Sequence, residues 1–206
     1  MNVEPRIIAL LLAAGRSRRM GAFKPFLPFG ERTVIEACLE NLRAAGLREI
    51  IVVVGHRADE VRAKLKDWRV DFAHNPDPKS AMSASIACGI ASIREEADAV
   101  MIALADQPAI PPSVMRSLIE ARKATGAKLI VPEWQGRRGH PVLIDLALRD
   151  DLLRLDETRG LRALLDQKRD LLHCVSVSSP YVVRDIDTWA EYCALHEEIF
   201  GRREAT

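Results

Sequence analysis

Four cations follow an apolar run in the stretch LLAAGRSRRMGAFK, residues 11–24, and no acidic residue separates them. They are Arg16, Arg18, Arg19 and Lys24. A glycine-containing loop after a strand can direct backbone N–H groups at an anion, and Gly15 and Gly21 permit close approach of the backbone. Arginine can bind phosphate oxygens through paired hydrogen bonds. The stretch therefore predicts a polyphosphate-binding loop; an exposed, solvated basic loop is the plainer alternative.

A second stretch, ALADQPAI (residues 103–110), ends an apolar run with the carboxylate of Asp106. An ionised carboxylate at such a place is costly unless it is hydrated, paired or bound to a cation. Mg²⁺ commonly binds through one or two carboxylates together with substrate phosphates. Asp106 is therefore a candidate magnesium ligand beside the basic loop. The alternative is a turn former or helix cap before Pro108.

Two further stretches carry candidate polar groups. In VRDIDTWAEY (residues 183–192), Asp185 and Asp187 are two residues apart, so their side chains would share a face of an extended segment. Asp187 could instead cap the helix expected after it. NPDPKSAMSASIACGI (residues 75–90) is rich in turn residues and small side chains, which indicates a loop leading into a helix that Ser83 could cap.

Short apolar runs without strict alternation indicate the strands that must position these residues, buried on both faces. The runs are residues 7–14, 49–55, 70–75, 99–106 and 128–134, with a weaker one at 173–179. Helical spacing covers residues 33–46, 58–68, 113–126 and 187–201. The first of these helices opens with a possible capping box, Thr33 and Glu36. This alternation predicts an α/β domain with a mostly parallel sheet, to which residues 136–144 add a hairpin or mixed strand.

Ligands of such sheets bind beyond the carboxyl ends of the strands. That rule brings the candidate stretches together along one rim. They are residues 14–24, 55–56, 75–85 and 106–108.

Composition excludes several classes of protein. The 206 residues suit one large domain, and a hydrophobic content of 48% argues against disorder. A formal net charge of +1 gives no overall field directed at nucleic acid or membrane. The four cysteines form no metal-binding spacing, which favours buried thiols and a cytoplasmic location. The apolar run at residues 7–14 is shorter than the ~18 residues of a membrane span.

The basic stretch closely resembles the signature L-A-[AG]-G-x-S-x-R-M-G-x-x-K of MobA-like nucleotidyltransferases, whose loop binds the triphosphate of the incoming nucleotide. The resemblance implies a single-domain, three-layer α/β/α fold of the nucleotide-diphospho-sugar transferase type, with a Rossmann-like sheet. The domain would span residues 1–206 with a core of about 6–195. By position, the resemblance implies nucleotide binding by Ala13, Ala14, Gly15, Arg16, Ser17, Arg19, Gly21 and Lys24. Arg19 and Lys24 would hold phosphate charge.

Other stretches extend the resemblance along the chain. ADQP resembles the family's metal-binding strand end, so Asp106 would be a ligand, with Asp187 or Asp185 completing the Mg²⁺ site. Residues 75–90 resemble the loop that contacts the nucleotide base. There Ser85 and Gly89 match, Ser83 is a further candidate, and Ala81 stands where glycine is common.

The stretch GRRGHPVLI resembles one branch of the family, the MocA-like cytidylyltransferases, through Gly139, His140 and Pro141. His140 and Arg138 would then lie near the acceptor substrate. From the residues alone, a single histidine before a strand is more often structural, and the arginines could simply be solvated.

The resemblance implies a Mg²⁺-dependent cytidylyltransferase that transfers CMP from CTP to a phosphate of molybdopterin. Arg19, Lys24 and Asp106 would be its catalytic residues, and a molybdenum hydroxylase could receive its product. One alternative is a guanylyltransferase acting on the same cofactor. Another is a cytidylyl- or uridylyltransferase acting on a sugar or polyol phosphate. An alternative of a different class is a non-catalytic nucleotide- or cofactor-binding chaperone for a molybdenum hydroxylase.

Overall fold

The computed structural model describes residues 4–201, apart from residues 18, 78–80 and 95. Within this part of the chain, an eight-stranded sheet runs in the order β10-β7-β9-β6-β1-β4-β5, and β8 pairs with β7 beside this path. Its strands are β1 (Ile7–Leu12), β4 (Glu49–Val54), β5 (Asp71–His74), β6 (Ala99–Leu104), β7 (Leu129–Trp134), β8 (Arg137–Arg138), β9 (Val142–Asp145) and β10 (Leu172–Ser176).

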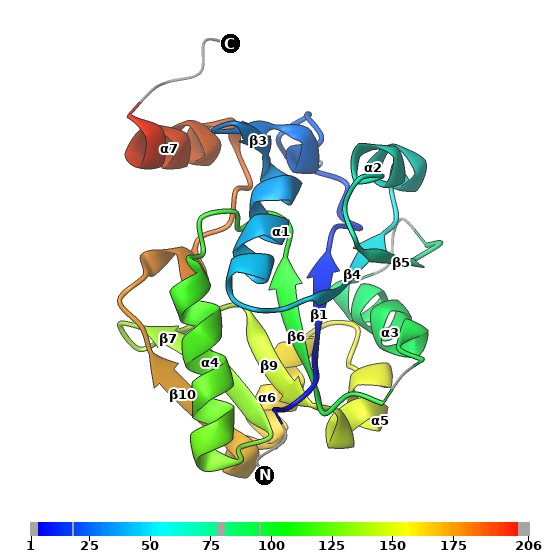
Figure 1. Ribbon diagram of the computed structural model, residues 1–206, viewed down its shortest axis with the longest axis vertical. Coiled ribbons are helices and arrows are strands. Elements are labelled where there is room, and N and C mark those ends of the chain that lie inside the picture. Colours follow the sequence, from blue (N-terminus) through cyan, green and yellow to red (C-terminus); the bar gives the residue numbers. More distant parts are fainter. Residues whose placement is uncertain (1–3, 18, 78–80, 95, 202–206) are drawn as a thin grey trace.

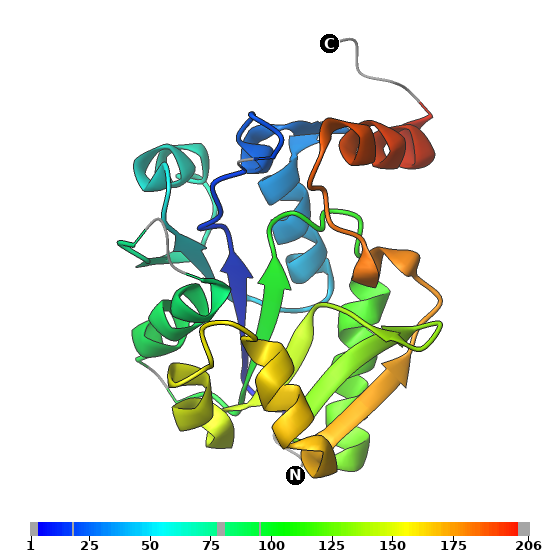
Figure 2. The same cartoon turned by 180° about the vertical axis from the view of Figure 1, so that it is seen from behind.

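Helices cover both faces of the sheet (Figures 1 and 2). One face carries α1 (Val34–Ala44), α2 (Ala58–Lys64) and α4 (Pro112–Thr125). The other carries α3 (Met82–Ser92), α5 (Arg149–Leu153) and α6 (Leu161–Gln167). Side chains of β1 alternate between the two cores, with Ala9 and Leu11 in the first and Ile8 and Leu10 in the second. The expected three-layer α/β/α class is confirmed.

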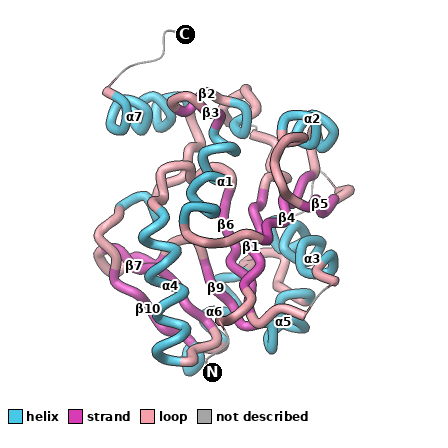
Figure 3. The backbone as a smooth tube through the Cα atoms, in the orientation of Figure 1, coloured by secondary structure: helices cyan, strands magenta, loops and turns pink. Residues whose placement is uncertain are grey.

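The central strands are parallel, as expected: β1 pairs in parallel with both β4 and β6. The exception is β9, which runs antiparallel to β6 and β7. Together with β8, it is the hairpin and mixed-strand region expected at residues 136–144. Figure 3 shows the strands enclosed by helices on both sides.

Local signals account for several boundaries. The Glu36 carboxylate accepts hydrogen bonds from the Thr33 N–H at 3.0 Å and hydroxyl at 2.6 Å, so the expected capping box begins α1. Gly126, at a φ of 67°, ends α4 in the left-handed conformation that glycine adopts readily. The helix expected over 58–68 is shorter and ends at Lys64. None of the described helices is long and apolar enough to cross a membrane.

A third hydrophobic cluster lies above the carboxyl ends of the strands. There α7 (Trp189–Phe200) packs beside the small hairpin of β2 (Pro28–Phe29) and β3 (Arg32–Thr33), as Figure 1 shows. A short helix, η4 (Pro180–Val183), precedes α7. The chain between η4 and α7 returns to the sheet edge, where the Ile186 N–H donates to the Asp106 carbonyl at 3.1 Å. We call residues 184–188 the strap.

Candidate active site

A cavity of about 560 Å³ lies where β1 and β6 end. Its wall is formed by the loop after β1, the end of β6, the region before and at the start of α3, and the strap. The lining residues are Leu12, Ala13, Ala14, Gly15, Arg16, Ser17, Arg19, Lys24, Pro25, Asp77, Met82, Ser85, Leu104, Ala105, Asp106, Asp185 and Asp187. Most of the residues expected to bind nucleotide and metal therefore share one cavity.

Ser17 closes the loop that follows β1. Its hydroxyl accepts the Lys24 N–H at 3.1 Å, and its carbonyl accepts the Gly21 N–H at 3.3 Å. Ser17 and Gly21 both have positive φ angles, of 50° and 72°. Gly21 shapes the turn, and it is not among the residues that line the cavity. Arg18, one of the four cations of this stretch, lies outside the described residues.

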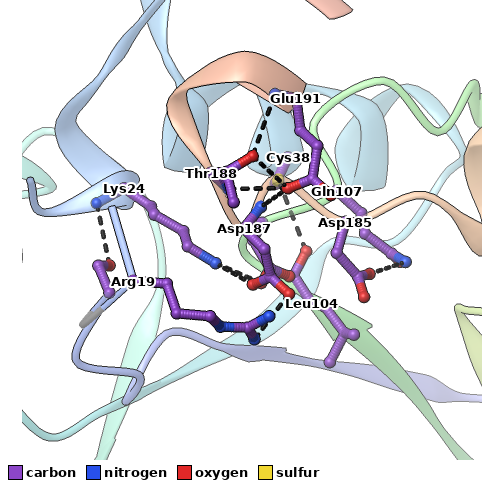
Figure 4. Close-up of polar contacts among 11 residues, drawn as sticks. Arg19, Lys24, Cys38, Leu104, Gln107, Asp185, Asp187, Thr188 and Glu191 are labelled. Atoms are coloured by element: carbon purple, nitrogen blue, oxygen red, sulfur yellow. Dashed lines mark hydrogen bonds and ion pairs between the residues drawn. The ribbon is translucent and has the colours of Figure 1, made fainter. Parts of the chain in front are cut away.

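Lys24 lies at the centre of the site and is only 8% exposed. Its Nζ is 2.6 Å from Asp187 Oδ1 and 3.4 Å from Asp106 Oδ2. Arg19 Nη2 is 2.7 Å from the other oxygen of Asp187 (Figure 4). The fold thus brings the cations of the loop after β1 into contact with carboxylates that are distant in the sequence. Asp106 and Asp187 are 82 and 163 positions away from Lys24.

The two carboxylates differ in their electrostatics. Burial raises the pKa of Asp106 above its ordinary value; the Lys24 charge opposes this, and the charges of Asp185 and Asp187 reinforce it. Burial also acts to raise the pKa of Asp187, but the hydrogen bonds and charges of Lys24 and Arg19 outweigh it and lower that pKa. Asp187 is thus the more strongly stabilised anion, held by two cations.

Asp187 is not the cap of α7. That role belongs to Thr188, whose hydroxyl accepts the Glu191 N–H at 3.3 Å while Glu191 Oε2 accepts the Thr188 N–H at 2.8 Å. The Asp187 side chain is therefore available to the cavity. Similarly, α4 begins at Pro112, too far along the chain for Asp106 to be its cap.

Asp185 has a different partner. Gln107 Nε2 donates to Asp185 Oδ1 at 2.7 Å, and the glutamine is 5% exposed. Gln107 is not among the site residues predicted from the sequence. Its only signal there was its place directly after Asp106, which carries no information about a contact 78 positions away.

A buried amide organises the region before α3. Asn75 Nδ2 donates to Ser85 Oγ at 2.9 Å, and Ser85 lines the cavity. Ser83 is buried within α3 and does not cap it, because the residue before the helix is Ala81. Gly89 packs against Leu10 and Val53 of the sheet and not against the cavity, and a Cβ there would lie 2.9 Å from Val53. Asn75, like Gln107, is not among the site residues predicted from the sequence.

The two acceptor candidates lie outside the cavity wall. Arg138 is exposed in β8. The His140 N–H donates to the Val182 carbonyl at 2.9 Å, which joins its segment to η4. Burial lowers the pKa of the His140 imidazole, and the Asp185 charge opposes that effect. His140 is thus electrostatically coupled to the site without lining it.

The donor set fits a hard divalent cation bound together with phosphate. Asp106 and Asp187 present carboxylate oxygens on one cavity, and both are balanced by cations. Among the described residues, no group of three or more His, Cys, Asp or Glu side chains forms a metal cage. Mg²⁺ commonly completes such a pair of carboxylates with substrate phosphates and water.

The sequence places the chain in a known family. Residues 9–172 match the MobA-like NTP transferase domain, and the chain belongs to this nucleotidyltransferase family. It is 31% identical over 194 residues to nicotine blue oxidoreductase of Paenarthrobacter nicotinovorans, which covers 89% of this chain and 93% of that protein. It is 26% identical over 193 residues to molybdenum cofactor cytidylyltransferase of Escherichia coli K12, with 93% and 96% covered.

Several solved structures share the fold of this chain over almost its whole length. Rv0371c of Mycobacterium tuberculosis superposes with a TM-score of 0.84 and 29% identity, covering 95% of this chain and 100% of that one. Its complex with manganese has a TM-score of 0.80, 28% identity and the same coverage. A nucleotidyl transferase from Methanothermobacter has a TM-score of 0.81 and 28% identity, covering 94% and 97%. The expected fold type and family are confirmed.

Proposed function

We propose that the protein is a Mg²⁺-dependent nucleotidyltransferase that transfers CMP from CTP to a phosphate of a molybdopterin-type acceptor and releases pyrophosphate. One observation carries the proposal: Lys24 contacts both Asp106 and Asp187 in the cavity that the loop of residues 13–24 lines. This arrangement supports the proposal, because cations suited to phosphate and carboxylates suited to a divalent metal lie around one cavity.

The chain's own residues bind and orient the triphosphate. Arg16 and Arg19 are exposed at the cavity, and Arg19 must exchange its ion pair with Asp187 for phosphate oxygens. Lys24 exchanges its carboxylate partners for the triphosphate, which releases Asp106 and Asp187 for the cation. Positioning and neutralisation of charge are the main contributions that a protein makes to phosphoryl transfer.

Asp106 and Asp187 would hold the Mg²⁺, with Asp185 a further candidate. The ion supplies charge neutralisation on the phosphates and orients the leaving group. An oxygen of the acceptor phosphate attacks the α-phosphorus, and the bond to the bridging oxygen of the β-phosphate breaks, so that pyrophosphate leaves with that oxygen. Lys24 and Arg19 stabilise the charge that grows on it. The acceptor phosphate is already ionised, so no side chain needs to remove a proton.

The identity of the nucleotide and the acceptor rests on the family branch. The Escherichia coli relative is a molybdenum cofactor cytidylyltransferase, and its match extends over nearly the whole chain. Ala13, Ala14 and Ser85 line the cavity where the base and ribose would bind. We place the acceptor on the side of His140 and Arg138. A guanylyltransferase acting on the same cofactor is the nearest alternative.

A second candidate function follows from the relative with 31% identity, which is an oxidoreductase. In that case the cavity would hold a reduced nicotinamide nucleotide, whose diphosphate also suits a basic loop. The paired carboxylates favour the transferase, because hydride transfer needs no divalent cation.

Pyrophosphate release tests the proposal directly. The protein is incubated with Mg²⁺ and each of CTP, GTP, UTP and ATP, with molybdenum-loaded molybdopterin, with a set of sugar and polyol phosphates, or with no acceptor. Binding of each nucleotide is measured by calorimetry. Asp106→Asn is assayed in parallel. Oxidation of NADH and NADPH with a quinonoid dye is measured on the same preparations.

We expect release that requires CTP, the pterin and Asp106 together. Release with another nucleotide would retain the mechanism and change the substrate. Oxidation of NADH or NADPH without pyrophosphate release would instead support the oxidoreductase. Nucleotide binding without turnover, on the pterin and on sugar or polyol phosphates alike, would favour the non-catalytic chaperone.

A further inference from the structure

The strap is held to the end of β6 at two adjacent points. The Ile186 N–H donates to the Asp106 carbonyl, and the Gln107 amide donates to Asp185 Oδ1 at 2.7 Å. Ile186 itself is 1% exposed within the cluster beneath α7. A buried, hydrogen-bonded residue therefore separates Asp185 from Asp187, and the carboxylates on either side of it both line the cavity.

A glutamine at position 107 carries a cost in folding free energy. It is buried, and its Oε1 has no hydrogen-bond partner among the described residues. Burying an unsatisfied amide oxygen is unfavourable, and an apolar side chain would avoid that cost. The compensation is the bond from Nε2 to an ionised carboxylate, which is stronger than a bond between neutral groups. The amide orientation is also determined, since Oε1 in its place would repel Asp185.

The partner of Asp185 differs in kind from those of the other two carboxylates. Lys24 neutralises Asp106 and Asp187, and Arg19 adds to this at Asp187. Among the described residues, no cation forms an ion pair with Asp185. Gln107 is neutral, so it fixes Asp185 Oδ1 without neutralising the negative charge, and no described residue donates a hydrogen bond to Oδ2. This bond can also persist when a divalent cation enters, whereas the Lys24 pairs must break.

We infer that Gln107 is a positioning residue that holds Asp185 toward a divalent cation in the cavity. Groups that hydrogen-bond to metal-binding carboxylates typically change metal affinity or activity by about 10- to 100-fold when they are removed. The inference shares with the proposed function the assignment of a divalent cation to this cavity. It does not depend on which nucleotide or acceptor is used.

The test is a double-mutant cycle read out by Mn²⁺ binding. Gln107→Met keeps the side-chain volume and removes the donor. Gln107→Asn, which is too short to reach Asp185, is a second variant. Both are compared with Asp185→Ala and with Gln107→Met/Asp185→Ala. The free Mn²⁺ signal in electron paramagnetic resonance gives the Kd, with and without CTP, and thermal unfolding verifies the fold of each variant.

Asn41→Leu is the matched control. Asn41 Nδ2 donates to the Pro108 carbonyl at 2.8 Å, so it holds the same segment without contacting a carboxylate. We expect Gln107→Met and Gln107→Asn to raise the Mn²⁺ Kd by about tenfold or more, and Asn41→Leu to raise it much less. Because Gln107 acts through Asp185, the double variant should be no worse than Asp185→Ala.

Several results would overturn the inference. They are an unchanged Kd in both Gln107 variants, additive effects in the double variant, an equal effect of Asn41→Leu, and a wild-type protein that binds no Mn²⁺ at millimolar concentrations. Failure of the proposed function looks different. In that case no nucleotide supports pyrophosphate release, while the Mn²⁺ cycle still shows the expected pattern.

Discussion

Lys24 determines the charge balance of the site. It is nearly buried, yet its Nζ is within ion-pair distance of two carboxylates, one of which also contacts Arg19. The cations expected to bind phosphate therefore neutralise the groups expected to bind metal when neither ligand is present. A triphosphate and its cation would exchange these internal pairs for external ones, so their binding should be mutually dependent.

Replacing Lys24 should move metal and nucleotide affinity in opposite directions. In Lys24→Met, two carboxylates lose a cation, so Mn²⁺ alone should bind more tightly. CTP with Mg²⁺ should bind more weakly, by about 10- to 100-fold, because a hydrogen bond to a charged group contributes about 1.5–3 kcal/mol. Titration of both ligands followed by calorimetry measures these changes.

Lys64→Met is the control, because Lys64 forms an ion pair with Glu36 at 3.2 Å outside the cavity. It should change neither affinity. If Lys24→Met weakened Mn²⁺ binding as well, the view that Lys24 competes with the metal would be wrong.

At the scale of elements, the start of α7 positions Asp187. Glu191 Oε2 accepts the N–H groups of both Asp187 and Thr188, at 3.0 and 2.8 Å. The capping box that begins the helix therefore also fixes the backbone of the carboxylate before it. The capping box of α1, formed by Thr33 and Glu36, has the same chemistry without a cavity carboxylate next to it.

The two capping boxes allow a matched comparison. Thr188→Ala and Thr33→Ala should each lower the free energy of unfolding by about 1 kcal/mol, measured by urea denaturation. Only Thr188→Ala should also weaken binding of CTP with Mg²⁺, because it loosens the turn that carries Asp187. Equal binding losses in both variants would indicate a general effect of stability and not of position.

At the scale of the whole molecule, the cavity joins segments that lie far apart in the sequence. Residues 13–24, 104–106 and 185–187 meet at one edge of the sheet, with the start of α3 opposite. A ligand that bridges these segments binds only the folded chain, so its binding free energy adds to the stability of the fold.

Combined ligands should therefore raise the Tm. At about 100 times the Kd, CTP with Mg²⁺ adds about 2.7 kcal/mol, which corresponds to roughly 5–10 °C for a chain of this size. CTP with EDTA, or Mg²⁺ alone, should shift the Tm much less, because the first offers new partners only to the cations and the second only to the carboxylates. Differential scanning calorimetry decides this, and equal shifts for CTP with and without Mg²⁺ would contradict the coupling.

Local patterns in the sequence were sufficient to predict the parallel core, and they also indicated where the candidate site residues lie. Apolar runs such as residues 49–55 and the Thr33–Glu36 capping box are local signals, because burial and helix capping depend on neighbours a few residues away. The basic stretch after β1 and the carboxylate at the end of β6 could be recognised in the sequence, because each directly follows an apolar run.

The tertiary structure brings together residues that lie far apart in the sequence. Lys24 contacts Asp106 and Asp187, which are 82 and 163 positions away in the sequence. Gln107 contacts Asp185, which is 78 positions away. The structure also shows that Thr188, and not Asp187, caps α7. Gly89 packs against the sheet and does not line the cavity. Such pairings depend on how the strap crosses the edge of the sheet. Periodicity and spacing indicate only local burial and capping. They therefore could not predict contacts between side chains that meet only in the folded chain.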